Sequence, residues 1–201
     1  MKPTEGDTRS ILIAVARGVF AREGYDGASI RTITTEAGAN LGAVTYHFGS
    51  KRDLYGAVLE SVLRPLVPRV KAAVSGPGSG LERTLRAVGA FFDHLSENPD
   101  QPGLMMQEIA AGRSAPEPVL KVVRATLGTI ARTVREGQAD RSIRPGDPQL
   151  LTLSSIAQPV YLTLVRKLAP PVLGPINSGD VTDHVLEFVR RGLATAPGGD
   201  A

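Results

Sequence analysis

Hydrophobic residues recur every three or four positions through most of the chain, whereas runs of strand type are scarce. The first such pattern predicts a helix that Asp7 or Thr8 caps. It should extend to about Glu23, because Gly24 is suited to end a helix. The apolar positions of this helix are Ile11, Val15 and Val19, with Leu12 and Phe20 beside them.

Two short helices are predicted next, each with its own cap. Ser29 is placed to cap a helix at 30–37, and Gly38 ends it. Asn40 is placed to cap the following helix, at about 41–48, before another glycine breaks it. Two short helices joined by a tight turn and preceded by a longer helix are typical of a helix-turn-helix.

A fourth helix begins at Ser50, where Asp53 follows three residues later in a pattern close to a capping box. Pro65 and Pro68 come after its apolar positions, so the helix must kink or restart there. The stretch SGPGSG at 75–80 is the clearest linker composition in the chain. We expect it to separate the four-helix unit and its extension from the remainder.

The second half of the chain shows longer helical patterns. Asp147 is placed to cap one of them, with Pro148 at its first position. A proline-rich loop is expected at 169–179, and the end at 196–201 should be disordered. The predicted helices are 81–98, 102–111, 119–139, 149–168 and 181–194.

Composition places the chain among ordinary soluble proteins. It has 201 residues, 42% hydrophobic and 21% charged, and no apolar run near the roughly 20 residues that span a bilayer. The polar start does not resemble a signal peptide. The lack of cysteine excludes disulfides and thiolate metal sites. These features together favour a cytoplasmic location.

The placement of charge is more informative than the net value of +3. Residues 1–71 hold 10 Lys+Arg and 7 Asp+Glu, which gives +3, and residues 72–201 hold 13 of each, which gives zero. Chance alone accounts for such an asymmetry as well as function does. The alternative is a small N-terminal unit that meets a polyanion, attached to a neutral body.

The segment GANLGAVTYHFGSK, at 38–51, concentrates polar chemistry in and around the second short helix. Ala43, Val44 and Phe48 are placed to pack inward, which leaves Thr45 and Tyr46 near the outer side. A DNA major groove could receive that outer side. A lysine in the first turn of the next helix is placed to meet a phosphate.

Residues 8–60 resemble the DNA-binding domain of the TetR family of bacterial transcriptional regulators. The resemblance rests on F-x-x-x-G-Y at 20–25, on A-S-I at 28–30 as it opens the first short helix, and on Y-H-F-x-S-K-x-x-L-Y at 46–55. The motifs cover about a quarter of the chain. Many family members have two aromatic residues before the histidine, whereas the first position here is Thr45. That departure affects any inference about the operator sequence.

The resemblance implies a set of DNA contacts. Arg31 would meet a base edge or a phosphate, and Leu41 would touch a thymine methyl. Alternatively, Arg31 and Lys51 are solvated charges, Tyr46 packs against the first helix, and His47 forms an internal hydrogen bond. The implied contact residues are Arg31, Leu41, Gly42, Ala43, Thr45, Tyr46, His47 and Lys51.

The resemblance also implies an all-α fold with two domains. Residues 1–53 would form the helix-turn-helix DNA-binding domain and residues 54–201 a helical effector-binding and dimerisation domain. The helix at 149–168 is apolar on almost every side, so with the last helix it is expected to meet its copy in a homodimer. Twofold symmetry would match a palindromic operator on double-stranded DNA.

The function expected on this basis is ligand-responsive repression, with activation as the alternative for the same fold. An apolar or amphipathic organic effector is expected, because the body carries adaptable apolar side chains and no dense charge cluster. Its binding residues are predicted to be Phe92, Met106, Gln158 and Tyr161.

Two other classes of protein are less consistent with the sequence. An enzyme is disfavoured, because the three histidines are widely separated and no nucleophile motif or phosphate loop occurs. We therefore expect no catalytic residue, no metal and no cofactor. A DNA-coating protein would carry Lys and Arg along its whole length, whereas the body here is neutral.

Overall fold

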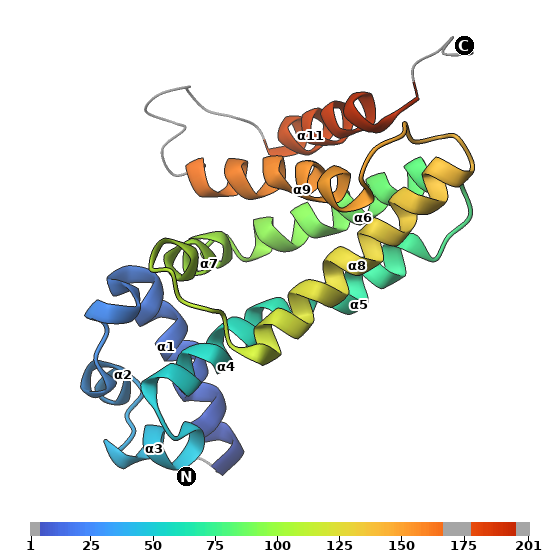
Figure 1. Ribbon diagram of the computed structural model, residues 1–201. Coiled ribbons are helices and arrows are strands. Elements are labelled where there is room, and N and C mark those ends of the chain that lie inside the picture. The colour runs from blue at the N-terminus through green and yellow to red at the C-terminus, as the bar shows by residue number, and fades with distance from the viewer. Residues whose placement is uncertain (1–4, 167–177, 196–201) are drawn as a thin grey trace. The chain divides into compact units, whose positions relative to one another are not determined.

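The computed structural model describes residues 5–166 and 178–195, and within these ranges the chain is helical, with one isolated bridge between Ile143 and Ala194 (Figure 1). The predicted all-α fold is confirmed. The N-terminal helices are α1 (Glu5–Gly27), α2 (Ile30–Glu36), α3 (Gly42–Phe48), α4 (Lys51–Leu63) and α5 (Leu66–Val74). The later helices are α6 (Gly80–Glu97), α7 (Gln101–Ala110), α8 (Glu117–Ala139), α9 (Pro148–Val165) and α11 (Ser178–Leu193).

The chain forms two compact units. The first unit contains residues 1–64 and 100–122, and the second contains residues 65–99 and 123–201. Helix α7 therefore belongs with the N-terminal helices, although α5 and α6 lie between them in the sequence. These compact units do not test the predicted boundary between a DNA-binding domain at 1–53 and an effector-binding and dimerisation domain at 54–201, which stays a prediction.

The first unit is built around α1 and α4, against which α2, α3 and α7 pack. Phe20 of α1 and Tyr55 of α4 meet edge to face, with their ring centres 4.8 Å apart. Both side chains are fully buried, as are Leu12 and Leu54 on the same helices. Of the apolar positions that predicted α1, Leu12, Val19 and Phe20 are buried, whereas Ile11 is 39% exposed.

The ends of α1 differ from the expectation. The helix begins at Glu5, so Asp7 and Thr8 lie inside it and the predicted cap at these residues is wrong. Its regular backbone is broken at Gly24, as predicted, where φ is 72° and ψ is 172°. One further helical turn follows up to Gly27. The conformation at Gly24 is one that a residue with a side chain rarely adopts.

The second unit packs α6 against α5, α9 and α11. Ser79 caps α6 in a capping box with Glu82. Helices α5 and α6 pack against each other in one unit, so the segment at 75–80 is a connection within that unit and not the domain linker that its composition suggested. A side chain cannot be added at Gly80, because its Cβ would lie 2.1 Å from the backbone nitrogen of Gly137.

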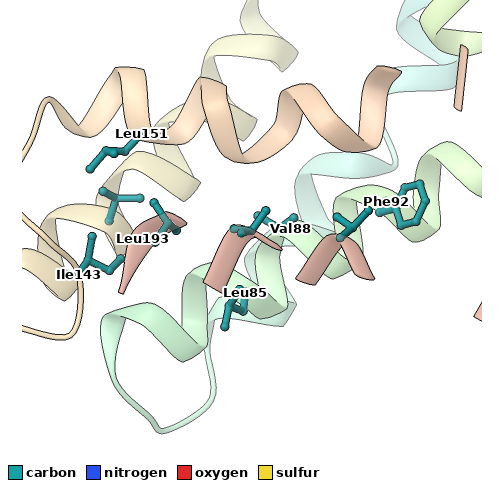
Figure 2. Close-up of a cluster of buried hydrophobic side chains, with 9 residues drawn as sticks. Leu85, Val88, Phe92, Ile143, Leu151 and Leu193 are labelled. Carbon is teal, nitrogen blue, oxygen red and sulfur yellow. The ribbon is translucent and has the colours of Figure 1, made fainter. Parts of the chain in front are cut away.

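Two apolar clusters lie on different sides of α6. Phe92 belongs to a cluster with residues of α8, α9 and α11, part of which Figure 2 shows around Leu85, Val88 and Leu193. Phe91 belongs to the other cluster, with residues of α5 and α8. The two adjacent rings therefore do not line one wall, as expected from their 100° separation on a helix.

Helices α9 and α11 run side by side in Figure 1 (orange and red). Asp147 caps α9 as predicted, because its side chain accepts hydrogen bonds from the N–H groups of Gln149 and Leu150. Helix α9 ends at Val165, and the predicted continuation to Leu168, most of the loop at 169–179 and the end at 196–201 lie outside the described residues. Among the described helices, none is long and apolar enough to cross a membrane.

Candidate nucleic-acid interface

Helices α2 and α3 are joined by a tight turn. The hydroxyl of Ser29 accepts a hydrogen bond from the N–H of Thr32 and so caps α2 as predicted. At Gly38 the backbone has φ of 62°, and the N–H of Ala39 donates to the carbonyl of Thr34 at 2.9 Å. These local bonds fix how α3 leaves the turn, and they build the predicted helix-turn-helix.

Helix α3 begins one residue later than expected. Leu41, not Asn40, occupies the cap position, its backbone is already helical, and no side chain bonds to the helix start. The predicted Asn40 cap is therefore wrong. Asn40 contributes its backbone carbonyl instead, which accepts from the N–H of Ala43 at 3.0 Å.

The two faces of α3 are sharply different. Ala43 and Val44 are buried, so the side chain of Ala43 faces the core. Leu41 is 61% exposed and Tyr46 is 73% exposed. Gly42 and Thr45 are also exposed, so the helix presents a surface with little bulk near its start and a phenol beyond it.

His47 is half-buried and lies between two aromatic rings. Its ring centre is 5.0 Å from that of Tyr46 and 6.2 Å from that of Phe48. The guanidinium of Arg9 lies over Phe48, 5.1 Å from the ring centre. This edge of α3 is consequently an aromatic surface with a cation beside it. Arg31, near the start of α2, is exposed.

The start of α4 brings further positive charge to the first unit. Ser50 caps this helix as predicted, and its hydroxyl also donates to the carboxylate of Asp53 at 2.5 Å. Lys51 is half-buried, and its Nζ lies 4.6 Å from the ring centre of Tyr25 and 3.5 Å from the carbonyl oxygen of Asp26. The lysine is thus held beside the end of α1.

An ion-pair network around a buried carboxylate lies next to this lysine, and no sequence pattern predicts it. Glu108 of α7 is only 1% exposed, and its carboxylate pairs with Arg52 at 2.6 Å and with Arg113 at 3.1 Å. Arg113 also pairs with Asp26 at 3.2 Å. Arg52 donates to the carbonyl of Ser114 at 2.7 Å. No local pattern links residues so far apart in the chain.

The predicted effector residues are divided between the two units. Phe92, Gln158 and Tyr161 belong to the second unit and Met106 to the first. Phe92 is buried in an apolar cluster, whereas Tyr161 is 63% exposed. The side-chain oxygen of Gln158 is buried and has no hydrogen-bond partner among the described residues.

In the ranges 5–166 and 178–195, no cluster of three or more His, Cys, Asp or Glu residues could hold a metal ion. The charged residues that do cluster around Glu108 are paired with one another. The functional groups of the first unit therefore form a surface with exposed cations and hydrogen-bonding groups.

A helix-turn-helix with an exposed second helix defines a DNA-binding class of protein. Residues 12–58 match the model of the bacterial regulatory proteins of the tetR family. A structure of a tetR-family regulatory protein from Rhodococcus RHA1 has a TM-score of 0.80 at 19% identity and covers 94% of this chain and 98% of its own. Residues 12–58 are therefore similar to the DNA-binding part of the tetR-family regulators, and the chain as a whole shares the fold of such a protein.

Two named relatives show how far the similarity extends. The transcriptional activator FasR of Mycolicibacterium smegmatis is 34% identical over 46% of this chain, and the match spans 42% of FasR, less than half its length. The transcriptional repressor KstR2 of the same species is 26% identical over 94% of this chain and 92% of its own. Both are regulators, with opposite effects on transcription.

Proposed function

We propose that the protein is a sequence-specific DNA-binding transcriptional regulator, and that it represses transcription as a homodimer on a palindromic operator. The observation that supports this most directly is the division of α3 into a buried face at Val44 and an exposed face at Leu41 and Tyr46. Such a helix can enter a major groove and remain attached to its domain. Activation is the alternative, since FasR is named an activator.

The proposed DNA contacts follow the exposure of the side chains. Arg31 and Thr45 read base edges, and Gly42 allows the backbone of α3 to approach them. Tyr46, His47 and Lys51 hold the phosphate backbone. Leu41 contacts a thymine methyl, and Ala43, whose side chain is buried, contributes through its backbone.

Selection from a library of random-sequence duplexes tests this proposal. The full chain should enrich a palindromic sequence. Arg31→Ala and Thr45→Ala should change the preferred bases, each with a loss of discrimination of about 1–3 kcal/mol. Arg191→Ala, at an exposed position of α11, is the control and should enrich the parent sequence. If no sequence is enriched, the protein is not a sequence-specific regulator.

A homodimer is supported by the exposed apolar face of α9. Leu150 and Leu153 lie within one arc of that helix and are exposed, as is Phe188 on the neighbouring α11. Apolar faces of this kind on a soluble protein mark interaction surfaces. We place a second copy of the chain there, with α9 and α11 of each copy forming a four-helix bundle.

Sedimentation at micromolar concentration tests the dimer. The parent protein should sediment as a dimer, and Leu153→Glu should convert it to a monomer by placing a charge in the bundle. Ile109→Glu is the control, because Ile109 is also an exposed apolar residue but lies on α7, in the first unit. A monomeric parent, or a dimer that survives Leu153→Glu, would remove α9 from the interface.

We further propose that an apolar or amphipathic organic molecule binds the second unit near Phe92, Gln158 and Tyr161 and weakens operator affinity. The unpaired, buried oxygen of Gln158 supports a ligand that donates a hydrogen bond there. By linkage, operator DNA must weaken the affinity for the ligand by the same factor. Met106 was predicted from sequence for the same site, and its participation stays a prediction.

Titration of an apolar compound library against the protein–operator complex tests this proposal. Compounds that release the DNA identify effectors, and each is then titrated against Gln158→Leu, Tyr161→Phe and Met106→Ala proteins. Gln158→Leu should weaken an effector that carries a hydrogen-bond donor and leave one without a donor unchanged. An effector to which all three variants respond as the parent does would place the site elsewhere.

A further inference from the structure

Three cationic side chains lie close to the ring of Tyr25. Its centre lies 4.6 Å from Lys51 Nζ, 4.8 Å from the guanidinium carbon of Arg113 and 5.5 Å from that of Arg52. Each distance is within the range over which the face of an aromatic ring attracts a cation. The ring itself is held in place by two others, Phe20 at 6.1 Å and Tyr55 at 5.1 Å. The ring of Tyr25 is therefore held in a fixed position, with three positively charged side chains close to it.

The three cations are not equivalent. Arg52 and Arg113 both pair with the buried carboxylate of Glu108, and Arg113 pairs with Asp26 as well, so each arginine has a carboxylate partner. Within the part of the chain that the structure describes, the ammonium of Lys51 contacts the ring of Tyr25 and the carbonyl oxygen of Asp26, neither of which carries a formal charge. The positive charge of Lys51 is thus localised and still available to an anion.

Holding the ammonium of Lys51 in one place affects how tightly it can bind a phosphate. A lysine side chain has four rotatable bonds, and fixing them on contact with a phosphate reduces affinity. A ring that already holds the ammonium removes part of that loss without neutralising the charge. A carboxylate in the same place would hold the lysine equally well but would compete with the phosphate.

We propose that Tyr25 is a positioning residue of the DNA interface, which holds the ammonium of Lys51 where it meets a phosphate of double-stranded DNA. This inference rests on the proposed function and adds to it a residue that the contact pattern of α3 does not include. Tyr25 acts through Lys51 and does not itself contact a base. Its contribution should consequently disappear when Lys51 is removed.

The test is the salt dependence of DNA affinity, measured for the full chain on its selected operator and on a mixed-sequence duplex. Lys51→Ala should reduce the slope of log affinity against log salt by about one unit. Tyr25→Leu should reduce it by roughly half a unit to one and weaken binding about three- to tenfold, whereas Tyr25→Phe keeps the ring and should retain both values. The double variant Tyr25→Leu/Lys51→Ala should match Lys51→Ala alone.

A purely structural role of Tyr25 needs a separate control, because Tyr25→Leu also removes contacts with Phe20 and Tyr55. Loss of folded protein lowers the active fraction, but it leaves the salt slope of the remaining molecules unchanged. Phenylalanine analogues with increasing ring fluorination at position 25 keep the shape and weaken the attraction for a cation in steps. They should lower the salt slope in the same steps, and only when Lys51 is present.

The outcomes separate this inference from the proposed function. If Lys51→Ala lowers the slope while the fluorinated series and Tyr25→Leu do not, Tyr25 is structural and the positioning role is wrong. If Lys51→Ala has no effect on the slope, Lys51 leaves the list of phosphate contacts and the positioning role falls with it. If the parent protein binds no duplex, the regulator function itself is wrong.

Discussion

Helices α7 and α11 are held in their units by different kinds of contact. In the first unit, Asp100, which precedes α7, bonds to Arg17 of α1, and Glu108 within α7 pairs with Arg52 at the start of α4. In the second unit, α11 contributes Val185, Val189 and Leu193 to an apolar cluster (Figure 2). Among the described residues, the ion pairs of α11 join its own exposed side chains, Glu187 to Arg190 and Arg191.

The difference shows what each kind of packing can supply. Apolar contacts stabilise in proportion to the buried area and tolerate exchange of similar side chains. Charged pairs require the right distance and direction, and a buried charge that loses its partner is costly. Helix α7 is therefore held beside the helix-turn-helix by a few specific ion pairs, whereas α11 is held by the apolar side chains that it buries.

The largest expected effect tests whether a buried ion pair contributes more to the free energy of unfolding than an exposed one. Glu108→Gln leaves Arg52 and Arg113 without their common carboxylate, so the free energy of unfolding should fall by roughly 3 kcal/mol in denaturant titrations. Asp26→Asn removes a second partner of Arg113, but Asp26 is 80% exposed, so its loss should cost less than about 0.5 kcal/mol. Equal losses for the two variants would contradict the distinction.

The close contact of α6 and α8 tests the second unit in the same way. Gly80→Ala places a methyl 2.1 Å from the backbone of Gly137, so the helices must separate and stability should fall by about 2–3 kcal/mol. Gly128→Ala, in α8, meets no atom within 4 Å and should raise stability by roughly 0.5–1 kcal/mol. Thermal unfolding of both proteins is the measurement, and a Gly80→Ala protein as stable as the parent would show that the helices separate at no cost.

Elements fixed by local chemistry could be predicted from the sequence. Ser29, Ser50 and Asp147 cap the helices that were expected of them, because a cap needs only a side-chain oxygen and the next few N–H groups. Asn40 has the same chemistry and does not cap α3. There the tight turn after Gly38 sets the path of the chain before a side-chain cap can form.

Features that depend on distant residues could not be predicted. The composition at 75–80 predicts a linker between two parts of the chain, yet Gly80 is required by its contact with Gly137 in another helix. Likewise, Glu108 in a short helix gave no signal that it pairs with Arg52, and the motif containing Tyr25 gave no signal that its ring holds Lys51. The exposed residues of α3 followed from its two-faced pattern, whereas the residues that support them required the fold.

A pH titration measures how strongly the interior of the first unit holds one phenol in its neutral form. Burial raises the pKa of Tyr55 to about 12, and the nearby carboxylate of Glu108 adds to the effect. The folded protein keeps this phenol neutral after the unfolded chain has ionised, so stability is complete below about pH 10 and is lost as pH rises toward 12. The loss should reach about 2 kcal/mol.

Tyr55→Phe is the control for this titration. It removes a hydrogen bond of 3.0 Å to the carbonyl of Leu104 and should be about 1 kcal/mol less stable than the parent at neutral pH. It should then lack the tyrosine's share of the alkaline loss, so the difference between the two proteins should shrink or reverse above pH 10. Parallel curves over the whole range would show that Tyr55 is not the titrating group.

The smallest effect is expected where the second unit does use an ion pair between helices. Arg69 of α5 and Glu97 of α6 approach to 2.8 Å, but their side chains are 37% and 57% exposed. A double-mutant cycle of Arg69→Ala and Glu97→Ala should give a coupling below about 0.5 kcal/mol, because water and side-chain entropy offset most of the attraction. Salt of about 1 M should abolish it, since the screening length there is roughly 3 Å. A coupling that persists in salt and approaches the cost of Glu108→Gln would mean that charge pairing stabilises both units to a similar extent. The contrast between α7 and α11 would then reflect only which residues each helix carries, and not a difference between buried and exposed ion pairs.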